Sequence, residues 1–136
     1  MSDKPKFAMY WAASCGGCEI AVLNIHEKIL DVDANFDVVF WPVAMDAKYK
    51  DVEAMEDGSI LLTLFNGGIR NDENEHIAHL LRKKSQILVA FGSCACEGCI
   101  PGLANLSPVS DITDTAFSTV STDNPDGIRP QTSYAM

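Results

Sequence analysis

Short apolar runs, separated by polar or small-residue segments, recur through the first hundred residues. Each run is only five or six residues long, which is the length of a strand rather than of a helix. Most are nearly continuous instead of alternating, as is typical of strands covered on both faces. The pattern predicts strands at residues 6–11, 36–41, 60–65 and 87–91.

A first helix is predicted after the first strand, because apolar residues recur there at helical spacing. Val22, Ile25 and Ile29 fall on one stripe, flanked by Leu23 and Leu30. The polar segment 46–57 is expected to contain a loop and a weak helix.

A second helix is predicted between the third and fourth strands. Asn71 or Asn74 can cap its start, and acidic residues occupy its first turn. Its inward positions are Ile77, Leu80 and Leu81, and it ends in the basic run 82–84, which suits the negative end of a helix.

The order strand, helix, strand, strand, helix, strand predicts an α/β fold built on an open, mostly parallel sheet. From about Asn105 the amino-acid composition changes: Ser, Thr, Asp and Pro dominate, and apolar residues become isolated. We therefore predict a folded domain at 1–104 and a polar C-terminal extension at 105–136, either loosely ordered or held by a partner.

Length and charge narrow the function classes. A chain of 136 residues suits one domain, and a formal charge of −9 disfavours binding to nucleic acid or to acidic membrane surfaces. No stretch approaches the roughly 20 apolar residues of a membrane helix, and the start does not resemble a secretory signal. The expected location is cytoplasmic, with no membrane insertion and no nucleic-acid partner.

Five cysteines fall into two groups. Cys15 and Cys18 form one, and Cys94, Cys96 and Cys99 form the other. Because cytoplasmic proteins seldom keep structural disulfides, such grouping favours metal or redox chemistry, with buried structural thiols as the alternative.

The two groups are predicted to meet in space. Cys15 and Cys18 follow the first strand, and Cys94 follows the last. The carboxyl ends of parallel strands share one edge of a sheet, which is where open α/β proteins bind ligands. Thiolates suit iron–sulfur clusters and zinc, and Gly16 and Gly17 leave room and amide groups for a bulky cluster.

Cys-x-x-Cys alone is a weak signal, which also occurs in redox dithiols and half zinc sites. The aromatic and proline neighbours usual in dithiol enzymes are missing here. The second group reads Cys-x-Cys-x-x-Cys, rather than the second Cys-x-x-Cys pair of a zinc site. A zinc-stabilised interaction module and a stand-alone thiol oxidoreductase remain open alternatives.

Several motifs together resemble the small subunits of nickel–iron hydrogenases, in particular the viologen-reducing type that works with heterodisulfide reductase. They are Cys15–Glu19, Asn66–Ile69, Asn71–Asn74, Gly92–Ala95 and Gly98–Leu103. The related small subunit of NADH:quinone oxidoreductase, of the same superfamily, usually has adjacent cysteines in the first motif. Gly16 and Gly17 separate them here, which favours the hydrogenase branch.

The resemblance implies a flavodoxin-like sheet with helices on both faces, holding the proximal 4Fe-4S cluster. Cys15, Cys18 and Cys94 match three of its four ligands. It also implies an oxidoreductase complex in which a large nickel–iron subunit splits hydrogen and a downstream iron–sulfur or flavin carrier receives the electrons.

The fourth ligand departs from the family pattern. The family supplies it from a later Gly-Cys-Pro-Pro motif that this sequence does not contain. Cys99 stands where the family commonly has a glycine, and we expect it to supply the fourth thiolate. Cys96 is the second candidate for this ligand. The alternatives are a ligand outside this chain or a domain without a cluster.

Other candidate residues have plainer explanations. Glu19 beside the ligands could relay protons or contact the large subunit, or be a surface carboxylate. His26, His76 and His79 fall on predicted helices and are expected to be packing or surface residues. Trp11 and Trp41 are expected in the core. Gly67–Gly68 lacks the surroundings of a nucleotide-binding motif.

Overall fold

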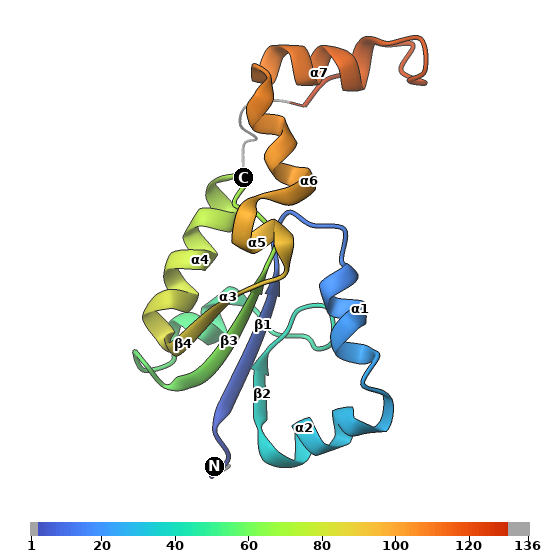
Figure 1. Ribbon diagram of the computed structural model, residues 1–136. Coiled ribbons are helices and arrows are strands. Elements are labelled where there is room, and N and C mark those ends of the chain that lie inside the picture. The colour runs from blue at the N-terminus through green and yellow to red at the C-terminus, as the bar shows by residue number, and fades with distance from the viewer. Residues whose placement is uncertain (1–2, 131–136) are drawn as a thin grey trace. The chain divides into compact units, whose positions relative to one another are not determined.

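The computed structural model describes residues 3–130, and Figure 1 shows the arrangement of its helices and strands. The chain forms two compact units, Met1–Gly102 and Leu103–Met136. A compact unit is not by itself a domain that folds independently. The domain boundary expected after residue 104 therefore stays a prediction.

Unit 1 is built on one parallel sheet (Figure 1). Its strands are β1 (Lys6–Trp11), β2 (Asp37–Phe40), β3 (Ile60–Asn66) and β4 (Ser85–Phe91). They lie side by side in the order β2-β1-β3-β4, and each neighbouring pair is parallel. This is the start of the flavodoxin-like order, so the predicted fold class is confirmed.

One face of the sheet carries α1 (Gly17–Leu23), the short 3₁₀ helix η1 (His26–Lys28) and α2 (Ile29–Asn35). Phe7, Met9 and Trp41 form its core, with Val22 and Ile29 packed against them. The expectation of one continuous apolar stripe is wrong, because the helix breaks after Leu23 and His26 takes a positive φ of 53°. After this break, the helical spacing of apolar residues no longer continues from that of α1. Leu23, Ile25 and Leu30 face solvent.

The other face is covered by α3 (Tyr49–Glu53) and α4 (Asp72–Lys84). Alternate residues of β1 point to opposite faces, so Ala8 and Tyr10 lie in this second core, with Phe40, Val52, Ile60, Phe65, Ile77 and Leu81. The α4 cap is Asn71, whose side-chain oxygen accepts from the Asn74 amide at 2.9 Å. The start and the basic end predicted for this helix are confirmed.

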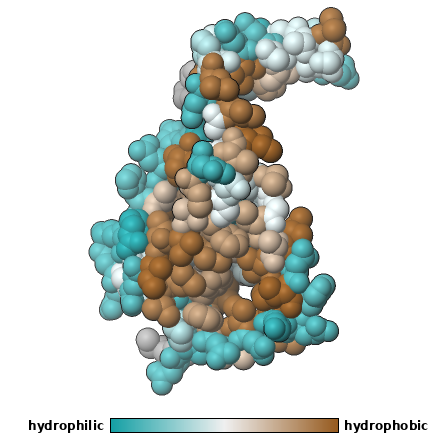
Figure 2. Space-filling view, in the orientation of Figure 1, coloured by the Kyte–Doolittle hydropathy of each residue, from teal (hydrophilic) through white to brown (hydrophobic). Residues whose placement is uncertain are grey.

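Strand β4 is less buried than its apolar sequence predicts. It lies at the edge of the described sheet, and Ile87 is 52% exposed. Ile87 and Val89 pair in register with Leu62 and Leu64 of β3. Apolar side chains therefore gather over β3 and β4 on the face seen in Figure 2.

Short helices follow β4. Unit 1 ends with α5 (Ser93–Glu97) and α6 (Cys99–Gly102), and the described part of unit 2 contains η2 (Leu103–Leu106) and α7 (Val109–Ser118). Helix α7 lies in the segment for which the polar composition predicted no element. Within unit 2, Arg129 holds α7 by contacts to Asp114 and Ser118. Among the helices of residues 3–130, none has the length and apolar character needed to cross a bilayer.

Candidate functional site

The loop after β1 takes a shape that depends on glycine. Gly16 has a φ of 81°, and a Cβ there would lie 2.7 Å from the Trp11 ring, so only glycine fits without displacing the indole. Trp11 is 40% exposed and donates from its ring nitrogen to the Ser14 carbonyl at 3.2 Å. The expectation that Trp11 fills the core is wrong, because it covers this loop instead.

The same loop is joined to the loop after β3. Ala13 and Gly68 form an antiparallel bridge with two backbone hydrogen bonds, of 3.1 and 2.9 Å. A Cβ on Gly67 would lie 2.8 Å from the backbone of Ala12 and Ala13, so glycine permits this close approach. The carboxyl ends of β1 and β3 are thereby fixed to each other.

The loop after β4 closes on the first cysteine pair. The Cys18 sulfur lies so near Gly92 that a Cβ on Gly92 would be 2.3 Å from it. Gly92 also has a φ of 86° and caps α5, in which Cys94 stands at the second position. The structure therefore brings Cys18 against the loop that carries Cys94, although the two residues lie at opposite ends of unit 1 in sequence.

Electrostatics show that the cysteines are close neighbours. Burial raises the pKa of Cys94, and the charges of Cys99, Cys15 and Cys18 raise it further. Burial likewise raises the pKa of Cys18, with contributions from Cys15, Glu19 and Cys96. All five cysteines are free thiols. Thiolates gathered in this way favour a cationic centre that would remove their mutual repulsion.

The thiols of the two groups are donors that an iron–sulfur cluster could use. Within residues 3–130, no group of three or more His, Cys, Asp or Glu side chains is arranged to hold a single metal ion. A cluster is larger and is bound by more widely spaced thiolates. The Gly17 amide already donates to the Cys15 sulfur at 3.4 Å, the type of contact that tunes such clusters.

The second cysteine group offers two further thiols. Cys99 lies near enough to Cys94 for a side-chain hydrogen bond that contributes to the raised Cys94 pKa. Cys99 itself has a φ of 40°, unusual for a residue other than glycine. Cys96 instead donates to the Ala90 carbonyl at 3.2 Å. The ligand roles of Cys15, Cys18, Cys94 and Cys99 stay predictions.

Glu19 is a buried residue, so its interpretation as a plain surface carboxylate is wrong. It is 3% exposed and accepts a hydrogen bond of 2.5 Å from the Trp41 indole nitrogen. Burial raises the pKa of Glu19, while Trp41 and Asn66 lower it in part. The sequence contained a signal for this burial, because Glu19 lies three residues before the inward-facing Val22.

Asn66 is a site residue whose burial the sequence pattern did not predict. It ends β3 and is fully buried. Both polar atoms of its side chain lack a hydrogen-bond partner, as does Glu19 Oε1. Asn66 is therefore a buried polar neighbour of Glu19, and three polar atoms of the two side chains are left without partners.

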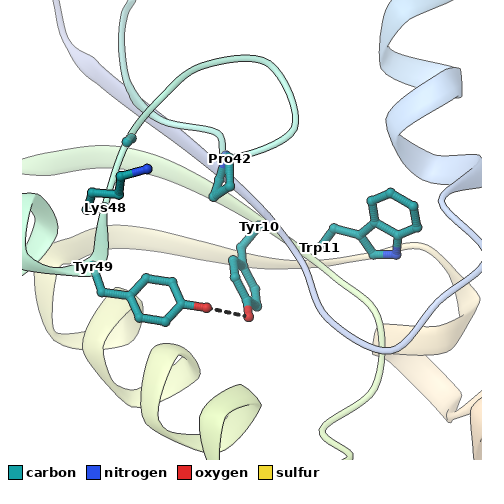
Figure 3. A pocket seen from close by; sticks show the side chains of 6 residues that line it. Tyr10, Trp11, Pro42, Lys48 and Tyr49 are labelled. Atoms are coloured by element: carbon teal, nitrogen blue, oxygen red, sulfur yellow. Dashed lines mark hydrogen bonds between the residues drawn. The ribbon is translucent and has the colours of Figure 1, made fainter. Parts of the chain in front are cut away.

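A separate hollow of about 420 Å³ lies beside Trp11, at the carboxyl ends of β1 and β2 (Figure 3). The Tyr10 and Tyr49 hydroxyl groups hydrogen-bond at 3.0 Å, and Tyr49 donates to Glu73 at 2.6 Å. The hollow contains no cysteine. Its lining consists of Tyr10, Trp11, Pro42, Ala47, Lys48 and Tyr49.

The three histidines lie apart from the cysteine loops. His76 and His79 of α4 are near Glu53 and Glu75, at 3.6 and 3.9 Å, and His26 is an exposed residue of η1. These placements agree with the expectation of surface histidines.

Comparison with known proteins places these motifs in a family. Residues 15–126 match the model of the 20 kDa subunit of NADH:ubiquinone oxidoreductase. The chain is 45% identical over 128 residues to the iron-sulfur subunit of the F420-non-reducing hydrogenase of Archaeoglobus profundus, covering 93% of this chain and 40% of that protein. With a subunit of the F420-non-reducing hydrogenase of Methanothermobacter thermautotrophicus it shares 36% identity, over 96% of this chain and 41% of that protein.

A solved structure is also similar. A chain of the NAD+-reducing [NiFe]-hydrogenase in its H2-reduced state has a TM-score of 0.81 and 26% identity, covering 94% of this chain and 67% of that one. The resemblance drawn from the cysteine motifs is therefore confirmed. The present chain spans about two fifths of the length of the two curated relatives.

Proposed function

Because the chain belongs to the family of the 20 kDa subunit of NADH:ubiquinone oxidoreductase, which includes hydrogenase small subunits, we propose that it is the electron-transferring part of a nickel–iron hydrogenase small subunit. In this role it binds the proximal 4Fe-4S cluster. It acts as one component of an oxidoreductase complex in the cytoplasm, and hydrogen is split in another chain.

The observation that carries the proposal is the meeting of the two cysteine groups at the carboxyl edge of the sheet. Cys18 rests on Gly92, and Cys94 lies within electrostatic reach of Cys15, Cys18 and Cys99. Redox proteins hold 4Fe-4S clusters with four thiolates. We assign three of them to Cys15, Cys18 and Cys94, and the fourth to Cys99.

A bound 4Fe-4S cluster supplies one-electron transfer at a potential that its surroundings set. The chain's own residues hold the thiolates in place. Gly16, Gly67 and Gly92 allow the loops to pack closely, and the Gly17 amide donates toward Cys15. Adding a side chain at Gly92 would move the Cys18 sulfur, because the two already touch.

The partners follow from the same proposal. A large nickel–iron subunit would cover the cysteine edge, deliver electrons to the cluster and shield it from solvent. A downstream iron–sulfur or flavin carrier would accept them. The exposed thiol-bearing segment Ser93–Gly102 is the surface we assign to the large subunit, because three of the five cysteines lie in it.

Replacing single cysteines tests the ligand assignment. In the full chain, reconstituted with iron and sulfide without oxygen, we expect Cys99→Ser to lower the iron and sulfide content to less than about half of the wild-type value, because one of four thiolates is lost. Iron and sulfide analysis and electron paramagnetic resonance measure occupancy and cluster type together.

Cys96→Ser is the matched control, since it changes the neighbouring thiol on the same segment. We expect it to keep wild-type iron, because Cys96 already donates to Ala90. Full occupancy in Cys99→Ser would exclude Cys99 as a ligand. A wild-type chain that binds no iron and sulfide would contradict the proposed function.

A further inference from the structure

The only buried residue of helix α1 within the described structure is an acidic one. Glu19 is 3% exposed, whereas Ile20 and Leu23 of the same helix are 60% and 52% exposed. A helix of seven residues is not stable on its own and takes its position from contacts with the rest of the fold. The contacts that Glu19 makes therefore contribute strongly to the position of α1.

The partners of Glu19 come from the carboxyl ends of two different strands. Trp41 follows β2, is 5% exposed, and donates its indole N–H to Glu19 Oε2 at 2.5 Å. Asn66 ends β3, is completely buried, and acts on the Glu19 carboxyl group as a second polar neighbour. One carboxyl group thus lies between two strand ends.

The polar atoms of this group are not all paired. Glu19 Oε1 and both polar atoms of Asn66 have no hydrogen-bond partner. Buried polar atoms without partners are costly, and proteins keep them mainly where they have a role. A leucine at position 19 would have packed against the sheet at a lower cost.

The carboxyl group is also directly connected to the cysteine loop. Glu19 follows Cys18, and its backbone amide donates to the Gly16 carbonyl at 3.1 Å, closing the first turn of α1. The α1 N-cap residue, Gly16, has no side chain to fix this turn. The Glu19 side chain therefore connects the turn bearing Cys18 to the end of β2 through Trp41.

We propose that Glu19 is a positioning residue, which holds Cys18 against Gly92 by anchoring the first turn of α1 to Trp41 at the end of β2. This proposal rests on the proposed function only in making Cys18 a cluster ligand. Glu19 itself touches no iron. Its role is to fix the place from which the Cys18 sulfur acts.

The test measures how fast iodoacetamide modifies Cys18 relative to Cys15 in the full chain without a cluster, by mass spectrometry. Cys15 is exposed and serves as the internal reference. We expect the ratio to rise about tenfold in Glu19→Ala and several-fold in Trp41→Phe, because the charge-assisted hydrogen bond is lost in both. Glu19→Gln keeps an acceptor for Trp41. Both variants remove the Glu19 charge that raises the Cys18 pKa, so a smaller rise in Glu19→Gln than in Glu19→Ala isolates the effect of the hydrogen bond.

Two controls separate positioning from a general loss of stability. Glu97→Ala removes an exposed carboxyl group that is also adjacent to a cysteine, and should leave the ratio unchanged. Ile77→Val weakens the fully buried core of α4, away from the loop, and should lower stability without raising the ratio. An unchanged ratio in Glu19→Ala, or an equal rise in Ile77→Val, would overturn the proposal.

The cluster gives an independent readout. In reconstituted chain, iron loss to a chelator, followed by the fall in visible absorbance, should be faster in Glu19→Ala than in Glu19→Gln. If wild-type chain binds no cluster, the proposed function fails, and the alkylation ratios still decide whether Glu19 positions Cys18. If the cluster binds and the ratios do not differ, the positioning role alone fails.

Discussion

At the scale of single residues, the absence of a side chain at Gly92 determines where the Cys18 sulfur can lie. Its backbone, with φ 86° and ψ 165°, is in a region almost restricted to glycine, and the sulfur occupies the space of a missing Cβ. Both constraints act at one residue. A substitution there should affect the backbone and the thiol together.

Gly92→Ala tests this double constraint. We expect the free energy of unfolding to fall by about 1–3 kcal/mol from backbone strain, and Cys18 to be displaced, with a loss of bound iron in reconstituted chain. Urea unfolding and iron analysis measure the two effects.

Gly58→Ala is the matched variant, because Gly58 also has a positive φ, of 69°, but nothing lies within 4 Å of its missing Cβ. It should lose about 1 kcal/mol from strain alone and keep its iron. Equal iron loss in both variants would mean that the Cys18 contact has no importance.

Single residues were predictable where their chemistry is rare and not where it depends on neighbours. The spacing of the cysteines and glycines is visible in the sequence, and it indicated the site. Trp11 and Glu19 were misplaced because apolar and charged residues are assigned by type to the core and to the surface. The spacing of Glu19 from Val22 indicates burial, but it does not indicate the hydrogen bond to Trp41. A tryptophan that covers a glycine loop depends on contacts that no local pattern encodes.

At the scale of elements, an ion-pair group joins the end of α4 to the turn before β3. Asp57 lies 2.9 Å from Lys84 and 3.4 Å from Lys83, and Lys84 also donates to the Met55 carbonyl at 2.5 Å. The hydrogen bond from Lys84 holds the pKa of Asp57 below its ordinary value, and the charge of Lys83 contributes. The α4 end is thereby fastened to the sheet.

This contact predicts a pH dependence of stability. Because the Asp57 pKa is lower in the folded than in the unfolded chain, its stabilisation is present above the unfolded value of about 3.9 and is lost as the pH falls through the folded value. Asp57→Asn should therefore lose less stability than wild type between about pH 5 and pH 2. Urea unfolding across that range measures the difference.

Glu56→Gln, which changes the adjacent exposed carboxyl group, provides the comparison. Its stability should follow the wild-type pH curve. If Asp57→Asn also followed that curve, the ion pairs with α4 would have no share in acid unfolding.

Elements were predictable where one pattern continues and not where it resets. The β-strands and α4 have uninterrupted apolar patterns or clear caps, and they appear in the structure at the expected places. The break between α1 and α2 depends on the positive φ of His26, a residue that tolerates but does not signal that conformation. The short helices after β4 have too few residues for a periodic pattern.

At the scale of the whole molecule, the described sheet is more completely covered on one face than on the other. Helices α3 and α4 bury the face of Tyr10 and Phe65. On the opposite face, Ile87 of β4 stays half exposed. The order of the elements in the sequence predicted a parallel sheet. It could not show which edge strand would keep apolar side chains exposed on one face.

The exposed apolar patch over β3 and β4 predicts that the protein binds a hydrophobic dye in solution. We expect wild-type chain to bind the dye ANS, and Ile87→Glu to bind less, because a charge breaks the apolar patch over β3 and β4. Its free energy of unfolding should change by no more than about 0.5 kcal/mol, since the side chain is already half in water.

Ile69→Glu changes an isoleucine of nearly equal exposure, 54%, outside that patch. It should leave dye binding as in wild type. An equal fall in both variants would mean that the dye does not report on the sheet face.

The strand order β2-β1-β3-β4 also makes the approach of the two cysteine groups depend on completion of the sheet. Because β3 lies between β1 and β4, Cys15 and Cys18 can face Cys94 only after β3 has paired with both of these strands. A chain cut before β4 would therefore keep Cys15 and Cys18 as a dithiol without the second cysteine group.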